Sequence, residues 1–210
     1  SDNKNLLSTL TTVDRDAIIV QLRANTKPET DIVTDSNQTI TVDLNDVVTN
    51  IQGKTPKDSI RSTSKVFEFG SSNITVELEI PTLERDSKIN ESFKGKVKSQ
   101  ISKNKKQPNK DSEKLLSEIY FIEICKYIKE LVVNTNDESK VVKFDNAGNI
   151  HQSLKVLETL PSSIVAAAAA YIAEVKEYRD SHIYYIDPST DEQVSLDVDA
   201  NMFTGIWAKA

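Results

Sequence analysis

Few residues of the types that carry out covalent or acid–base chemistry occur in this chain of 210 residues, which has two histidines and one cysteine. Such catalysis needs a nucleophile or proton-transfer group beside partners that shift its pKa. Cys125 lies in an apolar stretch typical of a buried thiol, and His182 follows a predicted helix, where a structural or exposed histidine is the common case. No serine stands in a nucleophile elbow. We therefore expect a protein that is not an enzyme. An enzymatic role would need His151 or His182 in a pocket with carboxylates.

The sequence predicts no cofactor and no metal. Its five glycines are scattered, so it contains neither a P-loop nor a dinucleotide fingerprint. A single cysteine excludes an internal disulfide and a cysteine-based zinc site. Asp197 and Asp199 have the right chemistry for a hard cation, but alternating acids are typical of the solvated face of a strand.

The segment 94–110, KGKVKSQISKNKKQPNK, has seven lysines and no acid, although the whole chain has a net charge of −6. Lysines attract phosphates, so one hypothesis is a nucleic-acid-binding accessory protein that uses Lys94 to Lys110. The segment lacks interleaved aromatic residues for stacking on bases. It is also typical of a solvated mobile loop, or of a loop that docks on an acidic partner, with Lys103, Lys105 and Lys106 as partner-binding residues.

Apolar residues are concentrated near the end of the chain, at Met202, Phe203, Ile206 and Trp207. They either complete the core of this chain or insert into a partner. We therefore add Met202, Phe203 and Trp207 to the candidate partner-binding residues.

Composition limits the compartment and the class of protein. Hydrophobic residues make up 38% of the chain and charged residues 28%, which predicts a modest core with long polar loops. The first residues, SDNKNLL, lack the pattern of a signal peptide, and no apolar run approaches the length of a membrane span. We expect assembly in the cytoplasm and no contact with a membrane.

The segment 160–199 has the clearest pattern of secondary structure. Pro161 and Ser162 suit the start of a helix, and apolar residues recur at helical spacing from Ile164 to Tyr178. After Asp180 the period changes to two, which predicts a hairpin. The other predicted elements follow from the same signals: helices at 13–24, 112–132 and 150–158, a short helix or irregular segment at 83–93, strands at 31–34, 40–44, 65–69, 74–80, 140–144, 183–186 and 194–198, and a loop at 50–63.

These elements predict an α+β fold, in which antiparallel hairpins pack on two long helices at 112–132 and 162–180. We divide the chain into a helix–hairpin unit at 1–50, a central hairpin region at 51–93, the basic loop 94–110, and a helical core with a hairpin at 111–210 that forms one compact unit with 1–93. The segments ITVDLNDV and VSLDVDANMF follow similar elements at the two ends of the chain. They either mark a degenerate repeat or are two hairpins that happen to have similar acidic faces.

Three stretches together resemble a known family. They are LLSTLTTVDRDAIIVQLRANTKP followed by ITVDL, then ITVELEIPTLERDSKINE followed by ICKYI, and finally LPSSIV with YIAEVKEY, HIYYID and VSLDVD. In this order they resemble the baseplate hub proteins of T-even-like contractile-tailed bacteriophages over nearly the whole chain. Some members carry paired cysteines at their hairpins. Here those turns read Thr34-Asp35-Ser36 and Asp187-Pro188-Ser189, so no zinc knuckle is carried over.

The resemblance implies a non-enzymatic protein that binds other tail and baseplate hub proteins. It would be either a minor structural subunit of the virion or a chaperone-like factor that prepares other hub proteins. Its location would be the host cytoplasm during assembly, with the virion tail baseplate open as a second location. The expected contact surfaces are the hairpin edges, the lysine-rich loop and the apolar C-terminal segment.

Overall fold

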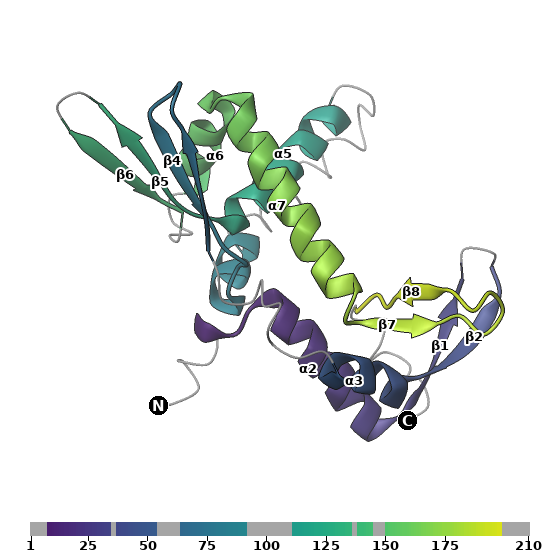
Figure 1. Cartoon of the computed structure of the whole chain (residues 1–210). Helices are drawn as coiled ribbons and strands as arrows, with labels where there is room; N and C mark the ends of the chain where they lie inside the picture. The colour runs from purple at the N-terminus through teal and green to yellow at the C-terminus, as the bar shows by residue number, and fades with distance from the viewer. Residues whose placement is uncertain are drawn as a thin grey trace. The chain divides into compact units, whose positions relative to one another are not determined.

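The computed structural model describes residues 8–34, 37–53, 64–91, 111–135, 138–144 and 150–198, and for residues 111–118 and 150–154 it describes only the backbone (Figure 1). The fold is α+β, as predicted, with helices and antiparallel sheets. The lysine-rich segment 94–110 and the C-terminal residues from 199 onward lie outside the described residues.

The chain forms two compact units, and each combines segments that are far apart in sequence. One contains Ser1–Thr12 and Arg61–Glu174, and we call it the sheet unit. The other contains Val13–Ile60 and Val175–Ala210, and we call it the hairpin unit. This grouping differs from the linear division suggested by the sequence, because contacts within each unit join distant segments.

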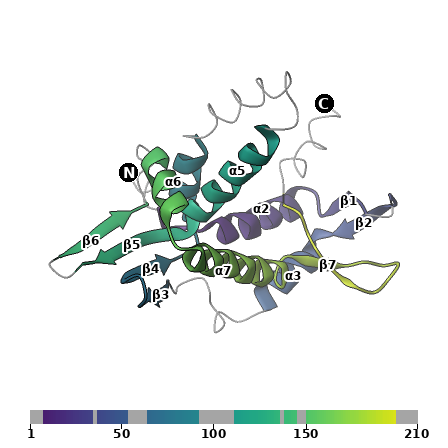
Figure 2. The same cartoon turned by 90° about the horizontal axis from the view of Figure 1, so that it is seen from above.

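The sheet unit is built on four antiparallel strands in the order β3-β4-β5-β6. The strands are β3 (Lys65–Phe69), β4 (Ile74–Leu78), β5 (Ile128–Asn134) and β6 (Ser139–Lys143). Its helices are an unlabelled helix at 83–91, α5 (Asp111–Tyr127), α6 (Ile150–Thr159) and the first part of α7 (Ser162–Asp180). In both views β6 lies at the outer margin of this sheet (Figures 1 and 2).

One face of this sheet forms the core. Side chains alternate between faces along a strand, which places Ile74, Val76 and Leu78 together, and all three are buried. From α7, Tyr171 packs edge-on against Tyr127 with ring centroids 6.2 Å apart. Lys65 on the same face of β3 pairs with Glu174 of α7. The opposite face is much more open, and we call it the open face: it carries Val66, Glu68, Thr75, Glu77, Glu130, Val132, Asn134, Ser139, Val141 and Lys143.

The prediction of one helix over 112–132 is wrong at its C-terminal end, where the structure has a strand. Helix α5 ends at Tyr127, and residues 128–134 form β5. The spacing of Ile124, Ile128 and Leu131 fits a helix, so it did not reveal the change. Strand β5 hydrogen-bonds to β4 on one side and to β6 on the other, and this pairing, with the β-branched Val132 and Val133, overrides the local helical pattern.

The hairpin unit contains most of α2 (Thr12–Thr26), two hairpins and a short helix. The hairpins are β1 (Glu29–Val33) with β2 (Thr39–Asp43), and β7 (Tyr184–Ile186) with β8 (Gln193–Ser195). Both hairpins, which the sequence predicted, contribute to one apolar core whose buried members are Val20, Ala24, Val42, Leu44, Val47, Ile183, Tyr185 and Leu196.

Helix α3 (Leu44–Gly53) was not predicted. It replaces the last residue of the predicted strand 40–44 and the start of the predicted loop 50–63. The Oδ1 atom of Asp43 accepts a hydrogen bond from the backbone N–H of Asn45 at 2.8 Å, so Asp43 caps the helix. Leu44 and Val47 then enter the core.

No helix among the described residues has both the length and the apolar character needed to cross a membrane.

Candidate functional site

A β-bulge in β5 is the irregular feature from which the candidate site of the sheet unit is built. Glu77 of β4 pairs with Glu130, but Leu78 pairs with Ile128, so Lys129 is an extra residue. A bulge re-aims side chains locally. Here it directs Lys129 to the open face, where its Nζ atom lies 2.9 Å from an oxygen of Glu77 and 3.7 Å from an oxygen of Glu79.

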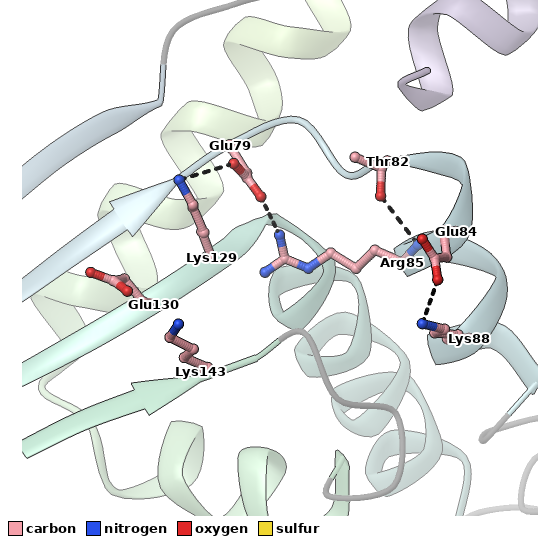
Figure 3. Close-up of a pocket in the computed structure, with 8 residues that line it drawn as sticks. All are labelled: Glu79, Thr82, Glu84, Arg85, Lys88, Lys129, Glu130 and Lys143. Carbon is pink, nitrogen blue, oxygen red and sulfur yellow. Dashed lines mark hydrogen bonds and ion pairs between the residues drawn. The ribbon is translucent and has the colours of Figure 1, made fainter. Parts of the chain in front are cut away.

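A pocket of about 320 Å³ lies beside this bulge (Figure 3). Strands β5 and β6 supply one part of its lining, and the segment from residue 79 through the helix 83–91 supplies the other. Its lining residues are Glu79, Thr82, Glu84, Arg85, Lys88, Lys129, Glu130 and Lys143. The site therefore joins an edge strand of the sheet to a charged pocket.

Most charges of the pocket are neutralised in pairs. Arg85, which is 6% exposed, donates from Nη1 to Glu79 at 2.8 Å and from Nη2 to the carbonyl of Ile128. Lys88 pairs with Glu84 at 2.6 Å on the same helix. The two contacts of Arg85 fix the helix 83–91 against Glu79 and β5, because its guanidinium has several donors held in a fixed fork.

Two charged groups of the pocket have no ion pair within the part of the chain that the structure describes. They are Glu130 of β5 and Lys143 of β6, which lie opposite each other in the sheet. Lys143 is exposed and Glu130 is partly buried. Figure 3 shows both side chains at the β5–β6 side of the pocket, separate from the paired groups. This side of the pocket therefore offers one cation and one anion to a charged ligand.

The pKa values of the bulge residues follow from their hydrogen bonds. The pKa of Glu77 is lowered, first by a hydrogen bond with the side chain of Ser64 and then by one with Lys129. The pKa of Lys129 is raised, first by its hydrogen bond to Glu77. Both groups are therefore charged near neutral pH, and the bulge is held by an ion pair.

The residues considered for catalysis lie in ordinary structural positions where the structure describes them. His182 follows the end of α7, where its Nδ1 donates to the carbonyl of Tyr178 at 2.7 Å and its ring lies 4.3 Å from the ring of Tyr178. The hydroxyl of Ser181 is 2.9 Å from the same Nδ1. This arrangement caps the helix C-terminus. His151 belongs to α6, and its side chain lies outside the described residues.

Cys125 is 1% exposed in α5, and burial raises the pKa of its thiol to about 12. A thiol with this pKa carries little thiolate at neutral pH, so its surroundings favour a core role.

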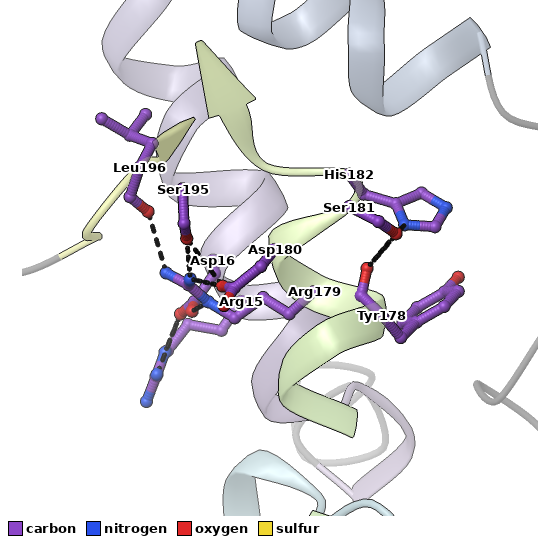
Figure 4. Close-up of polar contacts among 9 residues, drawn as sticks. All are labelled: Arg15, Asp16, Tyr178, Arg179, Asp180, Ser181, His182, Ser195 and Leu196. Atoms are coloured by element: carbon purple, nitrogen blue, oxygen red, sulfur yellow. Dashed lines mark hydrogen bonds and ion pairs between the residues drawn. The ribbon is translucent and has the colours of Figure 1, made fainter. Parts of the chain in front are cut away.

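A second charged cluster lies in the hairpin unit and joins α2, α7 and β8 (Figure 4). Asp16 accepts hydrogen bonds at 2.9 Å from Arg15 and at 2.8 Å from Nε of Arg179. Arg179 also donates to Asp180 at 2.8 Å and to the carbonyl of Leu196 at 3.1 Å. Burial alone would lower the pKa of Arg179, but the hydrogen bond and charge of Asp16 raise it. The cluster neutralises its own charges and holds three elements together.

The predicted partner-binding residues are not placed by the structure. Lys103, Lys105, Lys106, Met202, Phe203 and Trp207 lie outside the described residues, as does Asp199, whereas Asp197 is described and exposed. Within the described residues, no group of three or more histidine, cysteine, aspartate or glutamate side chains is arranged to hold a metal ion.

The pocket residues were not recognised in the sequence. The available signal was the alternation of charge in ELEIPTLERDSK and in IKE, but a solvated strand or helix has the same alternation.

Comparisons with protein-family models, with curated proteins and with solved structures gave no significant match to this chain.

Proposed function

We propose that this protein is a non-enzymatic assembly protein that binds other proteins of a bacteriophage tail baseplate hub. The observation that carries the binding role is strand β6 at the edge of the four-stranded sheet. Four of its five residues are exposed, including Val141 at 51%. An exposed edge strand presents unpaired backbone donors and acceptors to which another chain can pair.

Exposed apolar side chains in the hairpin unit also support a binding role. Ile18 and Leu22 lie one turn apart on α2 and are 41% and 57% exposed. Val33 at the end of β1 is 65% exposed, and Ile186 at the end of β7 is 49% exposed. Single exposed apolar residues are common on any protein, so these positions support the proposal only as a group.

The resemblance of the three sequence stretches to baseplate hub proteins supports the biological setting. It covers ITVELEIPTLERDSKINE, which contains β4 and the pocket residues from Glu79 to Lys88. It leaves open whether the protein stays in the virion or acts only during assembly.

The test is affinity purification of the tagged full-length chain from cells infected with a contractile-tailed phage that encodes it. We expect tail and baseplate proteins to co-purify, and their identification by mass spectrometry is the measurement. A comparison with purified virions then separates a structural subunit from a transient factor. The proposal fails if the tagged chain retains no tail protein above the level of a tag-only control.

A charge-reversal variant separates this proposal from the nucleic-acid alternative. Lys103→Glu, Lys105→Glu and Lys106→Glu together would abolish salt-sensitive retention of DNA or RNA if the lysine-rich segment bound phosphates. Under our proposal, nuclease treatment of the lysate leaves the co-purified tail proteins unchanged. Loss of all partners after nuclease treatment would favour the alternative.

A further inference from the structure

Strand β6 has a hydrogen-bonding partner on one side only among the strands that the structure describes. We propose that β6 takes up an acidic extended segment of a partner protein as a fifth strand of the sheet, with one carboxylate of that segment placed beside Lys143 at the mouth of the pocket. The inference rests on the proposed binding function and specifies the chemistry of the partner and the mode of its attachment.

The direction of the backbone groups of β6 follows from two hydrogen bonds. The N–H of Phe144 donates to the carbonyl of Lys129 at 3.3 Å, so residue 144 points toward β5. Alternate residues of a paired strand point the same way, which directs Val142 and Lys140 toward β5 as well. The N–H of Asn134 donates to the carbonyl of Asn73 at 2.8 Å, so the backbone groups of residue 134 point toward β4. Those of the alternate residues 133, 131 and 129 then point toward β6, which agrees with the direction found for β6. The backbone groups of Ser139, Val141 and Lys143 therefore point outward.

The charge of β6 selects the partner. Its sequence, SKVVK, has two lysines and no acid. If two copies of β6 paired with each other through their outward residues in an antiparallel arrangement, each Lys143 would lie opposite Ser139, Val141 or Lys143 of the other copy, and β6 has no acid to place there. Like charges directly opposite each other destabilise a strand pair, whereas opposite charges stabilise it. An acidic segment is therefore a better occupant than a second copy of this chain.

The register of the sheet predicts the pattern of the occupant. Residues directly opposite each other in neighbouring strands share a face. A residue opposite Lys143 therefore lies on the open face beside the pocket, and a residue opposite Lys140 lies on the other face. Between them, apolar residues suit Val141, which is exposed, and Val142, which is partly buried. The expected core of the occupant is acid–apolar–apolar–acid, which reads the same in both directions.

The pocket explains why the position beside Lys143 matters most. The neighbouring cations Lys129, Arg85 and Lys88 are already paired with Glu77, Glu79 and Glu84. Lys143 has no ion pair among the described residues, and it is the residue of the edge strand β6 that lines the pocket. A carboxylate from a fifth strand would supply the negative charge that pairs with Lys143, and charge-assisted hydrogen bonds are stronger than neutral ones.

The probe for the test is a short synthetic peptide with a glutamate–valine–valine–glutamate centre flanked by threonines, and the control peptide has lysines in place of the glutamates. Binding to the full chain is measured by fluorescence anisotropy. We expect the acidic peptide to bind at least about tenfold more tightly than the basic one, from two cross-strand charge pairs. The variant Lys140→Glu with Lys143→Glu is expected to reverse this preference. Absence of a preference in the wild-type chain, or an unchanged preference in the variant, would overturn the inference.

Two proline variants test attachment through the backbone. Val141→Pro removes an outward N–H of β6, and proline is tolerated on an edge strand when its missing N–H would face solvent. Val66→Pro is the matched control, because Val66 is also an exposed valine whose N–H points outward, on the opposite edge strand β3. We expect Val141→Pro to abolish peptide binding and Val66→Pro to preserve it. Equal binding by both variants would contradict strand addition.

Hydrogen exchange measured by NMR gives a readout that does not require a variant. On addition of the acidic peptide, the amides of Val141 and Lys143 should gain protection, whereas the inward amides of Lys140 and Val142 should change little. If the peptide fails to bind while tail proteins still co-purify with the chain, this inference is wrong and the proposed function stands. If the peptide binds but no tail protein co-purifies, strand addition to β6 stands and the proposed role in baseplate assembly is wrong.

Discussion

Asp16→Ala would remove the carboxylate that joins α2 to Arg179 of α7 in the hairpin unit (Figure 4). The side chains of Asp16 and Arg179 are 8% and 17% exposed. Loss of one partner of a buried ion pair leaves the other charge without full compensation and costs about 3–5 kcal/mol. Arg179 would retain its contact with Asp180, so we expect the lower end of this range, about 3 kcal/mol, or roughly a hundredfold in the unfolding equilibrium.

The matched control is an exposed ion pair of the sheet unit. Lys65 and Glu174 also form a close ion pair, but their side chains are 39% and 44% exposed. Water screens exposed pairs, so Glu174→Ala should cost no more than about 1 kcal/mol. The two variants compare buried and exposed carboxylates of similar geometry in one chain.

Native-state hydrogen exchange is the appropriate assay, because it measures opening of the two units separately. Asp16→Ala should lower the opening free energy of amides in β7 and β8 and should change those of β4 by much less. Replacing both partners, Asp16→Leu with Arg179→Met, should cost less than Asp16→Ala alone, since the charges that then lose a partner, Arg15 and Asp180, are 43% and 27% exposed to water. The reasoning is refuted if Asp16→Ala costs no more than Glu174→Ala.

Three further predictions concern Cys125, the bulge and a buried arginine. Burial raises the pKa of Cys125 from 9.0 to about 12, so iodoacetamide should alkylate the native thiol about a thousandfold more slowly than the urea-unfolded one, and equal rates would contradict this burial. The pKa of Glu77 is lowered in the folded state, so its contribution to stability is present above the ordinary carboxyl pKa and is lost as pH falls through the folded-state pKa. Glu77→Gln should therefore reduce the loss of stability at acid pH, measured by urea unfolding at a series of pH values. An unchanged loss of stability at acid pH would contradict the ion pair. Lys129 has the opposite dependence on pH. Its pKa is raised in the folded state, so its contribution to the free energy of unfolding is present at lower pH and is lost as pH rises through that folded-state pKa. Arg23 is 2% exposed, and its Nε and Nη1 atoms have no hydrogen-bond partner within the described part of the chain. Arg23→Met should therefore raise the unfolding free energy by about 1 kcal/mol or more, and a loss of stability would contradict this reasoning.

The hairpins were predictable because their signals are local. Each predicted hairpin has alternating apolar residues and a polar turn, and the turns contain residues that tolerate the left-handed backbone region. Asn37, Asn73 and Asp191 have φ values of 61°, 50° and 58°. Asparagine and aspartate adopt this region more readily than most other residues. Alternation and turn chemistry together were therefore sufficient to place these strands.

The end of α5 was not predictable from the same signals. Neither glycine nor proline separates Tyr127 from Ile128, and the apolar spacing continues through both elements. The segment becomes a strand because it pairs on one side with β4, which lies about 50 residues earlier in the chain, and on the other side with β6, which follows it. Helix α3 shows the opposite case, since Asp43 before Leu44 and Val47 was a local capping signal that the alternation of the preceding strand concealed.

The candidate site depends on the same long-range pairing. In a regular strand Lys129 and Glu130 would point to opposite faces, and only the register shift between Glu77 and Leu78 places Lys129 on the open face. Lys129 then pairs with Glu77, which leaves Lys143 as a cation of the pocket without an ion pair among the described residues. One extra residue in β5 therefore decides which charge is available to a partner at the sheet edge. A sequence pattern cannot reveal that choice, because it depends on which residues of β4 and β5 lie opposite each other.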